Sequence, residues 1–309
     1  MLIRRFHVYL LSMLFVSISV SAVTYHAPIG KSQWYLSSSI FECSLTHTIP
    51  EFGSGVFFHE AGEPLKFYLQ AKNNPLKEGR GAFVIESPDW LPGKVPQDLG
   101  YVDVVKSDRP ITVTERNATA MIASLMEGMA PTFTRKAWYS DDSVRVRLNS
   151  VNFRNHFEDY QACVSTLLPV NFRQVERSLV LFEVDKAILT KEDFQVLDNV
   201  IIYIKADKTV SSIYVDGHTD TSGRRIYNRR LSKERAETVT QYLIDNGIKN
   251  DMITTRYHGE RYPAVSNSTK ESRARNRRTT VRLERGPRVL RKPKVEAEDS
   301  ESLGDMRNG

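Results

Sequence analysis

The sequence contains little cysteine, with only two in 309 residues, and neither belongs to a zinc-binding spacing. A Walker loop and a dinucleotide-binding fingerprint are also absent. The apolar segment at residues 8–20 is shorter than the roughly 20 residues that span a bilayer comfortably. These absences argue against a zinc module, a nucleotide-dependent enzyme and a membrane-spanning helix, and no cofactor or metal is expected.

The composition is that of a globular protein, with 40% hydrophobic and 26% charged residues. A chain of 309 residues favours two domains. The net charge of +6 is modest, but basic residues cluster at 224–235 and 273–294. Such clusters suit an anionic cell-wall polymer as readily as a nucleic acid.

Residues 1–22 have the pattern of a signal peptide. Arg4 and Arg5 precede the apolar segment, and Val20-Ser21-Ala22 is a small-residue cleavage site. We therefore expect the mature chain to begin at Val23 and to have no membrane span; an uncleaved anchor is the alternative. No cysteine follows the apolar segment, which argues against a lipoprotein.

Both cysteines, Cys43 and Cys163, lie in the part of the chain expected to be exported. An oxidising compartment favours a disulfide between them. The alternative is two buried free thiols.

Residues 23–168 are expected to form a mostly β domain with one or two helices. Short apolar or alternating runs are separated by clusters of Gly, Pro, Asn and Asp. They occur at 56–58, 65–69, 82–85, 102–105, 111–113 and 144–148, with helices expected at 117–129 and 153–167. His47, His59, Asp141 and Asp142 could be arranged as a metal or hydrolase site, but scattered residues of these types are usually structural. We identify no catalytic residues and expect a partner-binding domain.

Residues 178–286 are expected to form an α/β domain, in which helices cover a mixed sheet. Residues 169–177 would be the linker, and the polar segment 287–309 a disordered tail. Strands are expected at 180–184, 209–215, 252–257 and 278–283, and helices at 194–204 and 224–246. Asn246-Gly247 is a helix-stop signal.

The helix expected at 224–246 carries a charge within its apolar face. At 100° per residue, Arg235 falls between Leu231 and Val239, and Asn228 falls on the same stripe. A buried, unpaired charge costs several kcal/mol, so Arg235 needs an anionic partner. Asp220 in the preceding turn and a bound carboxylate are two candidates. Alternatively, Asp220 caps the helix and Arg235 reaches out to solvent beside it.

Several spaced motifs resemble the peptidoglycan-binding domain of the OmpA-like family over about residues 178–285. They are G-H-T-D at 217–220, N-x-x-L-S-x-x-R-A-x-x-V at 228–239, G-x-x-x-P-x at 259–264 and N-R-R at 276–278. The resemblance implies recognition of diaminopimelate in the stem peptide, with Asp220 taking the ammonium and Arg235 the carboxylate. Asn228 and Leu231 would line the same site, and Asp185 and Arg278 match further contact positions. His218 is expected to be structural.

The whole layout resembles the MotY family of sodium-driven flagellar motors: a signal peptide, a β-rich domain with one disulfide, and an OmpA-like domain. This resemblance implies a non-enzymatic periplasmic protein in the T ring of the basal body. It would bind peptidoglycan rather than nucleic acid, hold the partner MotX and support stator assembly. A generic envelope tether and a wall hydrolase targeted by the OmpA-like domain are the alternatives.

Overall fold

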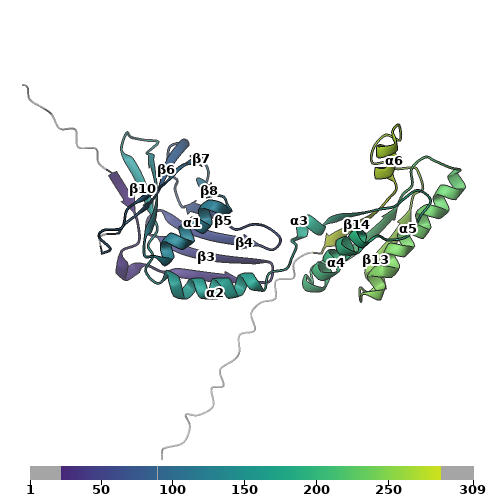
Figure 1. Ribbon diagram of the computed structural model, residues 1–309, viewed down its shortest axis with the longest axis horizontal. Helices are drawn as coiled ribbons and strands as arrows, with labels where there is room; N and C mark the ends of the chain where they lie inside the picture. The colour runs from purple at the N-terminus through teal and green to yellow at the C-terminus, as the bar shows by residue number, and fades with distance from the viewer. Residues whose placement is uncertain (1–21, 89, 287–309) are drawn as a thin grey trace, which may run out of the picture. The chain divides into compact units, whose positions relative to one another are not determined.

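The computed structural model describes residues 22–88 and 90–286. The chain divides into two compact units between Asn171 and Phe172 (Figure 1). The expected signal peptide, apart from Ala22, and the expected tail lie outside the described residues. The segment expected to be a linker, 169–177, contains the short helix α3 (Phe172–Val175) and the first residue of strand β11.

The first unit contains two five-stranded sheets. One has the order β2 (Trp34–Ser38), β3 (Glu42–Ile49), β4 (Gly53–Glu60), β5 (Lys66–Ala71) and β8 (Ile111–Val113), with antiparallel neighbours throughout. The other has the order β1 (Ala22–Tyr25), β10 (Ser143–Arg147), β9 (Ala130–Lys136), β6 (Gly79–Glu86) and β7 (Gln97–Val104), in which only β1 and β10 run parallel. The mostly β prediction is confirmed.

Stacked aromatic rings join the two sheets. Phe133 of β9 lies 4.5 Å from Phe83 of β6 and 5.9 Å from Phe67 of β5, between ring centroids. All three side chains are fully buried. Strand alternation explains this arrangement, since every second residue of a strand faces the same side. In β3 the inward set is Cys43, Leu45, His47 and Ile49.

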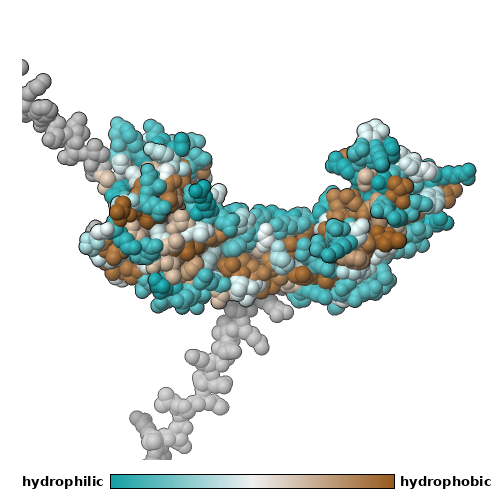
Figure 2. Space-filling view, in the orientation of Figure 1, coloured by the Kyte–Doolittle hydropathy of each residue, from teal (hydrophilic) through white to brown (hydrophobic). Residues whose placement is uncertain are grey.

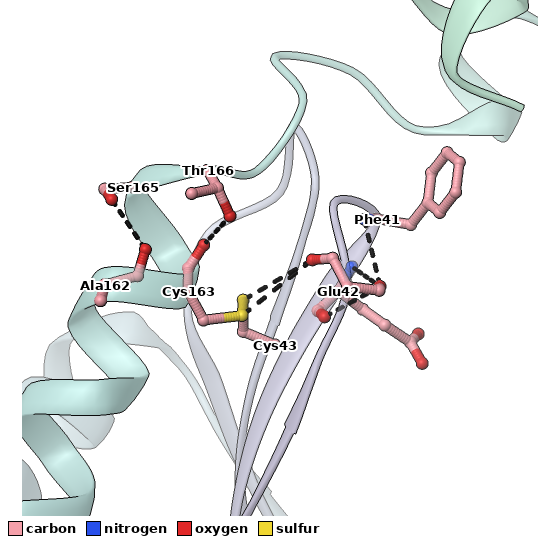
Figure 3. Close-up of a disulfide and its surroundings, with 8 residues drawn as sticks. Phe41, Glu42, Cys43, Ala162, Cys163, Ser165 and Thr166 are labelled. Atoms are coloured by element: carbon pink, nitrogen blue, oxygen red, sulfur yellow. Dashed lines mark hydrogen bonds between the residues drawn. A yellow bond between two sulfur atoms is a disulfide. The ribbon is translucent and has the colours of Figure 1, made fainter.

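The first unit also contains the two α-helices α1 (Glu115–Met126) and α2 (Phe153–Ser165). A disulfide joins Cys163 of α2 to Cys43 of β3, with the Cα atoms 6.1 Å apart (Figure 3). The predicted bridge between an early strand and a late helix is therefore confirmed. It closes a segment of 120 residues, which spans most of the unit.

The second unit has a mixed four-stranded sheet, as predicted. Its order is β11 (Arg177–Leu181), β14 (Arg278–Arg285), β12 (Val210–Gly217) and β13 (Ile253–Tyr257), and only β12 and β13 are parallel. Helix α4 (Lys191–Ala206) packs on β11, and α5 (Arg225–Asp245) packs on β12 and β13. The remaining short helices are η1 (Ile29–Lys31) in the first unit, and η2 (Asn250–Met252) and α6 (Lys270–Asn276) in the second.

Strand β11 begins three residues before its predicted start at Val180 and ends at Leu181, so the prediction of a strand through Val184 was wrong. The chain turns after Phe182, where Asp185 adopts a left-handed backbone with φ of 59°. Ser178 occupies a buried position of β11. Because this position holds a serine rather than an apolar residue, the alternating pattern of the strand is not apparent from the sequence there.

The end of β12 lies unusually close to α5. A Cβ atom on Gly217 would come within 2.1 Å of the Ser232 carbonyl oxygen. Only glycine allows this approach, which brings the turn after β12 against the buried face of the helix. At the other end of α5, Gly247 has φ of 85°, as the predicted helix stop requires.

The surface in Figure 2 is largely hydrophilic, with hydrophobic patches on both units. No helix among residues 22–88 and 90–286 is long and apolar enough to cross a membrane.

Candidate functional site

Asp220 lies in the turn between β12 and α5 and is 5% exposed. Its Oδ1 accepts a hydrogen bond from the Ser222 backbone N–H at 2.9 Å, and its Oδ2 accepts one from Arg277 Nη1 at 3.0 Å. Arg277 Nε donates to the Phe182 carbonyl oxygen at 3.0 Å. This largely buried ion pair therefore links three segments that are distant in sequence.

Arg235 is 0% exposed and binds three backbone carbonyl groups. Its Nε donates to Lys186 at 2.8 Å, Nη1 to His218 at 3.1 Å and Nη2 to Glu183 at 3.0 Å. The arginine thus fastens the loop after β11 to the turn after β12. It does not reach solvent, and the direct partner of Asp220 is Arg277.

The charges of this cluster act on one another. Burial lowers the pKa of Arg235 to about 10, and the neighbouring Arg277 charge acts in the same direction. The carboxylates of Asp220 and Asp185 oppose this shift. Arg235 remains charged at neutral pH. Two guanidinium groups therefore stand beside one buried carboxylate, which leaves a positive excess next to the exposed Asp185.

The same face of α5 brings Asn228 and Leu231 into the cluster. Asn228 is 1% exposed, and its Nδ2 donates to the Asp220 carbonyl oxygen at 3.3 Å and to the Glu260 carboxylate at 2.6 Å. Leu231 is 7% exposed and lies one turn before Arg235. The helix thus supplies an amide, an apolar wall and a cation in sequence.

Asp185 and Arg278 are placed differently. Asp185 is exposed, and its carboxylate accepts a hydrogen bond from the Tyr227 hydroxyl of α5. Arg278 Nη2 donates to the Tyr262 carbonyl oxygen at 3.1 Å, and burial lowers the pKa of its guanidinium. The structure therefore places Arg277, rather than Arg278, against Asp220.

Sequence reasoning passed over Arg277, although the strand pattern held a usable signal. Thr279, Val281 and Leu283 of β14 are the buried residues of that strand. Because strand side chains alternate in direction, Arg277 is in phase with this buried set and Arg278 is out of phase. Tyr227 and Glu260 were also missed, and no comparable signal in the sequence marks them.

His218 is buried and stacks on His258, with ring centroids 5.0 Å apart. Burial, together with the nearby Arg278 and His258, lowers the pKa of His218 to about 4. His47 is likewise buried, in the core of the first unit. Among the described residues, no group of three or more His, Cys, Asp or Glu could hold a metal ion.

Each of the two units matches a known protein-family model. Residues 25–169 match the MotY N-terminal domain, and residues 181–277 match the OmpA family. The second unit is therefore an OmpA-family domain.

Three relatives match the chain to different extents. The sodium-type flagellar protein MotY of Vibrio parahaemolyticus is 28% identical over 87% of this chain and 93% of its own length. Outer membrane protein A of Bordetella avium is 37% identical over 37% of this chain and 59% of its own length. The peptidoglycan-binding protein ArfA of Mycobacterium tuberculosis is 35% identical over 33% of this chain and 31% of its own length. The chain thus joins a MotY N-terminal domain to an OmpA-family domain, and it is similar to a MotY protein along most of its length.

Proposed function

We propose that the OmpA-family domain binds peptidoglycan non-covalently, through the diaminopimelate of its stem peptide, in the periplasm. The observation that carries the proposal is the arrangement of the buried Arg235 and the partly exposed Arg277 near Asp220, with the exposed Asp185 beside them. The similarity to a relative named for peptidoglycan binding supports the same function.

The chemistry of the ligand matches this arrangement. Diaminopimelate presents an ammonium and a carboxylate on one carbon centre, so its recognition needs an acid and a base a few ångströms apart. Asp185 and Asp220 face the ammonium. The carboxylate faces the guanidinium groups, which bind carboxylates strongly through paired, charge-assisted hydrogen bonds. Asn228 adds a polar contact and Leu231 an apolar wall.

Arg235 has two tasks in this proposal. Three of its N–H groups hold backbone carbonyl groups, two of which belong to the loop that carries Asp185. Because Arg235 is 0% exposed, its second task is electrostatic: its positive charge attracts the ligand carboxylate from beneath the surface. Arg277, with 13% of its side chain exposed, is the more accessible cation.

The first unit would attach this wall anchor to the flagellar motor. Similarity to a sodium-type flagellar MotY along 87% of the chain supports a structural place in the T ring of the basal body. There the first unit would hold MotX, and together they would support stator assembly. None of these tasks requires a chemical reaction, so we propose that the protein is not an enzyme. The second candidate, a generic envelope tether, differs only in what the first unit holds.

Two experiments test the proposal. The mature protein should sediment with purified peptidoglycan sacculi, and Arg277→Gln should weaken sedimentation at least tenfold. Arg230→Gln, which removes an exposed arginine paired with Glu234, should have no effect. Undiminished sedimentation of a folded Arg277→Gln protein would exclude this site.

Detergent-solubilised basal bodies should contain the protein together with MotX; absence from basal bodies would favour the tether.

A further inference from the structure

A cavity of about 320 Å³ lies between the first two turns of α5 and the loop that follows β13. Its walls include Arg225 and Arg229 of α5, and Tyr257, Glu260, Arg261 and Tyr262 from the other side. The volume is at the lower end of the range for small-molecule sites, which is about 300–1,000 Å³. It is large enough for one charged group and the atoms that carry it.

The positive charges in the walls of the cavity outnumber the negative charges of the residues around them. Arg225, Arg229 and Arg261 form no ion pair with any residue in the described part of the chain. Arg229 lies over the Tyr257 ring, with its guanidinium carbon 5.3 Å from the ring centroid. The one acid, Glu260, already accepts a hydrogen bond from Asn228 at 2.6 Å. Three unpaired arginines at one cavity favour an anionic ligand.

The cavity adjoins the candidate peptidoglycan site. The Asn228 amide connects them, because its Nδ2 donates both to Asp220 and to Glu260 in the cavity wall. Arg225 lies three residues before Asn228 on α5, a spacing that places Cβ atoms about 5–6 Å apart. The cavity and the candidate site are therefore neighbours at the N-terminal end of α5.

We propose that this cavity is a second subsite of the same ligand and binds a further carboxylate of the stem peptide. The inference rests on the proposed function. The residue that precedes diaminopimelate in the stem peptide is a γ-linked D-glutamate, and its α-carboxylate is free. Arg225 and Arg229 bind that carboxylate while Asp220 and Arg277 face the diaminopimelate. The pair of sites thus recognises the peptide rather than one amino acid.

The test uses the mature chain and three probes: free meso-diaminopimelate, the tripeptide L-Ala-γ-D-Glu-meso-diaminopimelate, and the same tripeptide with the glutamate α-carboxylate amidated. Affinities are measured by calorimetric titration. The wild-type protein should bind the free-acid tripeptide about tenfold more tightly than the amidated one, as expected for loss of a charge-assisted hydrogen bond. The variant R225Q/R229Q should bind both tripeptides equally and bind free diaminopimelate as the wild type does.

The matched control is R230Q/K233Q, which removes the same charge from exposed positions of α5 that pair with Glu234 and Glu237. It should keep the tenfold preference. Preference retained by R225Q/R229Q, or equal binding of both tripeptides by the wild type, would overturn the second subsite and leave the diaminopimelate site standing. Failure of the wild type to bind any of the three probes would contradict both proposals.

Discussion

The Asp220 carboxylate accepts a hydrogen bond from the Arg277 guanidinium at 3.0 Å, and the two side chains are 7% and 13% exposed. The pair joins the turn before α5 to the residue before β14. Removing one partner of a buried ion pair leaves an uncompensated charge and typically costs about 3–5 kcal/mol. The contact is therefore important for the stability of the OmpA-family domain as well as for its proposed ligand.

The first prediction concerns the coupling of this pair. Asp220→Asn and Arg277→Gln should each lower the free energy of unfolding of the second unit, by about 3 kcal/mol. The double variant should be less destabilised than the sum of the two single variants. Hydrogen exchange of the β12 and β14 amides measures the second unit by itself. Strictly additive effects would show that the pair does not interact.

The second prediction concerns the disulfide. All three tryptophans, Trp34, Trp90 and Trp138, lie in the first unit, so tryptophan fluorescence follows that unit alone. The variant C43S/C163S should be destabilised, by up to about 4–5 kcal/mol in the chain-entropy description of a long closed loop.

Reduction of the wild-type protein should reproduce the effect of C43S/C163S, and the reducing agent should leave C43S/C163S itself unchanged. Labelling of unfolded, unreduced protein should find no free thiol. Two labelled thiols in that experiment would contradict the bridge.

The third prediction is an acid-dependent loss of stability in the first unit. His47 Nε2 accepts the Asn149 backbone N–H at 3.2 Å, so Nδ1 carries the proton toward the Gln33 carbonyl oxygen at 3.1 Å. Burial lowers the pKa of His47 to about 4, and the bond with Gln33 opposes the shift. The unfolded chain, with a histidine pKa of about 6.5, takes up a proton more readily.

The contribution of His47 to the free energy of unfolding is therefore fully present above about pH 6.5. It declines as the pH falls toward 4, by about 3 kcal/mol at the acid end. Tryptophan fluorescence during urea unfolding at a series of pH values measures the decline. His47→Gln should flatten this pH dependence, whereas the exposed control His26→Gln should retain it. An unchanged slope in His47→Gln would show that other groups cause the acid sensitivity.

The regular elements that surround the site could be predicted from the sequence. Helix α5 begins and ends within one residue of the expected 224–246, because its apolar spacing and the Asn246-Gly247 stop are local signals. The position of Arg235 in the buried stripe was also visible. Its partners were not, because backbone carbonyl groups of Glu183, Lys186 and His218 leave no trace in side-chain patterns.

Other elements escaped prediction for physical reasons. Strand β9 contains Pro131, which usually marks an edge or a non-strand segment, yet β9 lies between β10 and β6. Strand β3 has serine, threonine and histidine among its apolar residues, which hides its alternation. Choosing between Arg277 and Arg278 required knowing which alternate residues of β14 face inward. Two adjacent arginines do not indicate this by themselves.

The most direct test of the central claim is whether the site recognises an ammonium and a carboxylate on one centre. Calorimetric titration of the mature protein should compare the tripeptide ending in meso-diaminopimelate with the tripeptide ending in L-lysine. The lysine peptide lacks only the carboxylate beside the free side-chain ammonium. A site with two guanidinium groups largely shielded from water should bind the diaminopimelate peptide at least about tenfold more tightly. Arg277→Gln should reduce this preference, and R230Q should not. Equal affinity of the wild-type protein for the two peptides would contradict the proposed recognition of diaminopimelate by Asp220, Arg235 and Arg277.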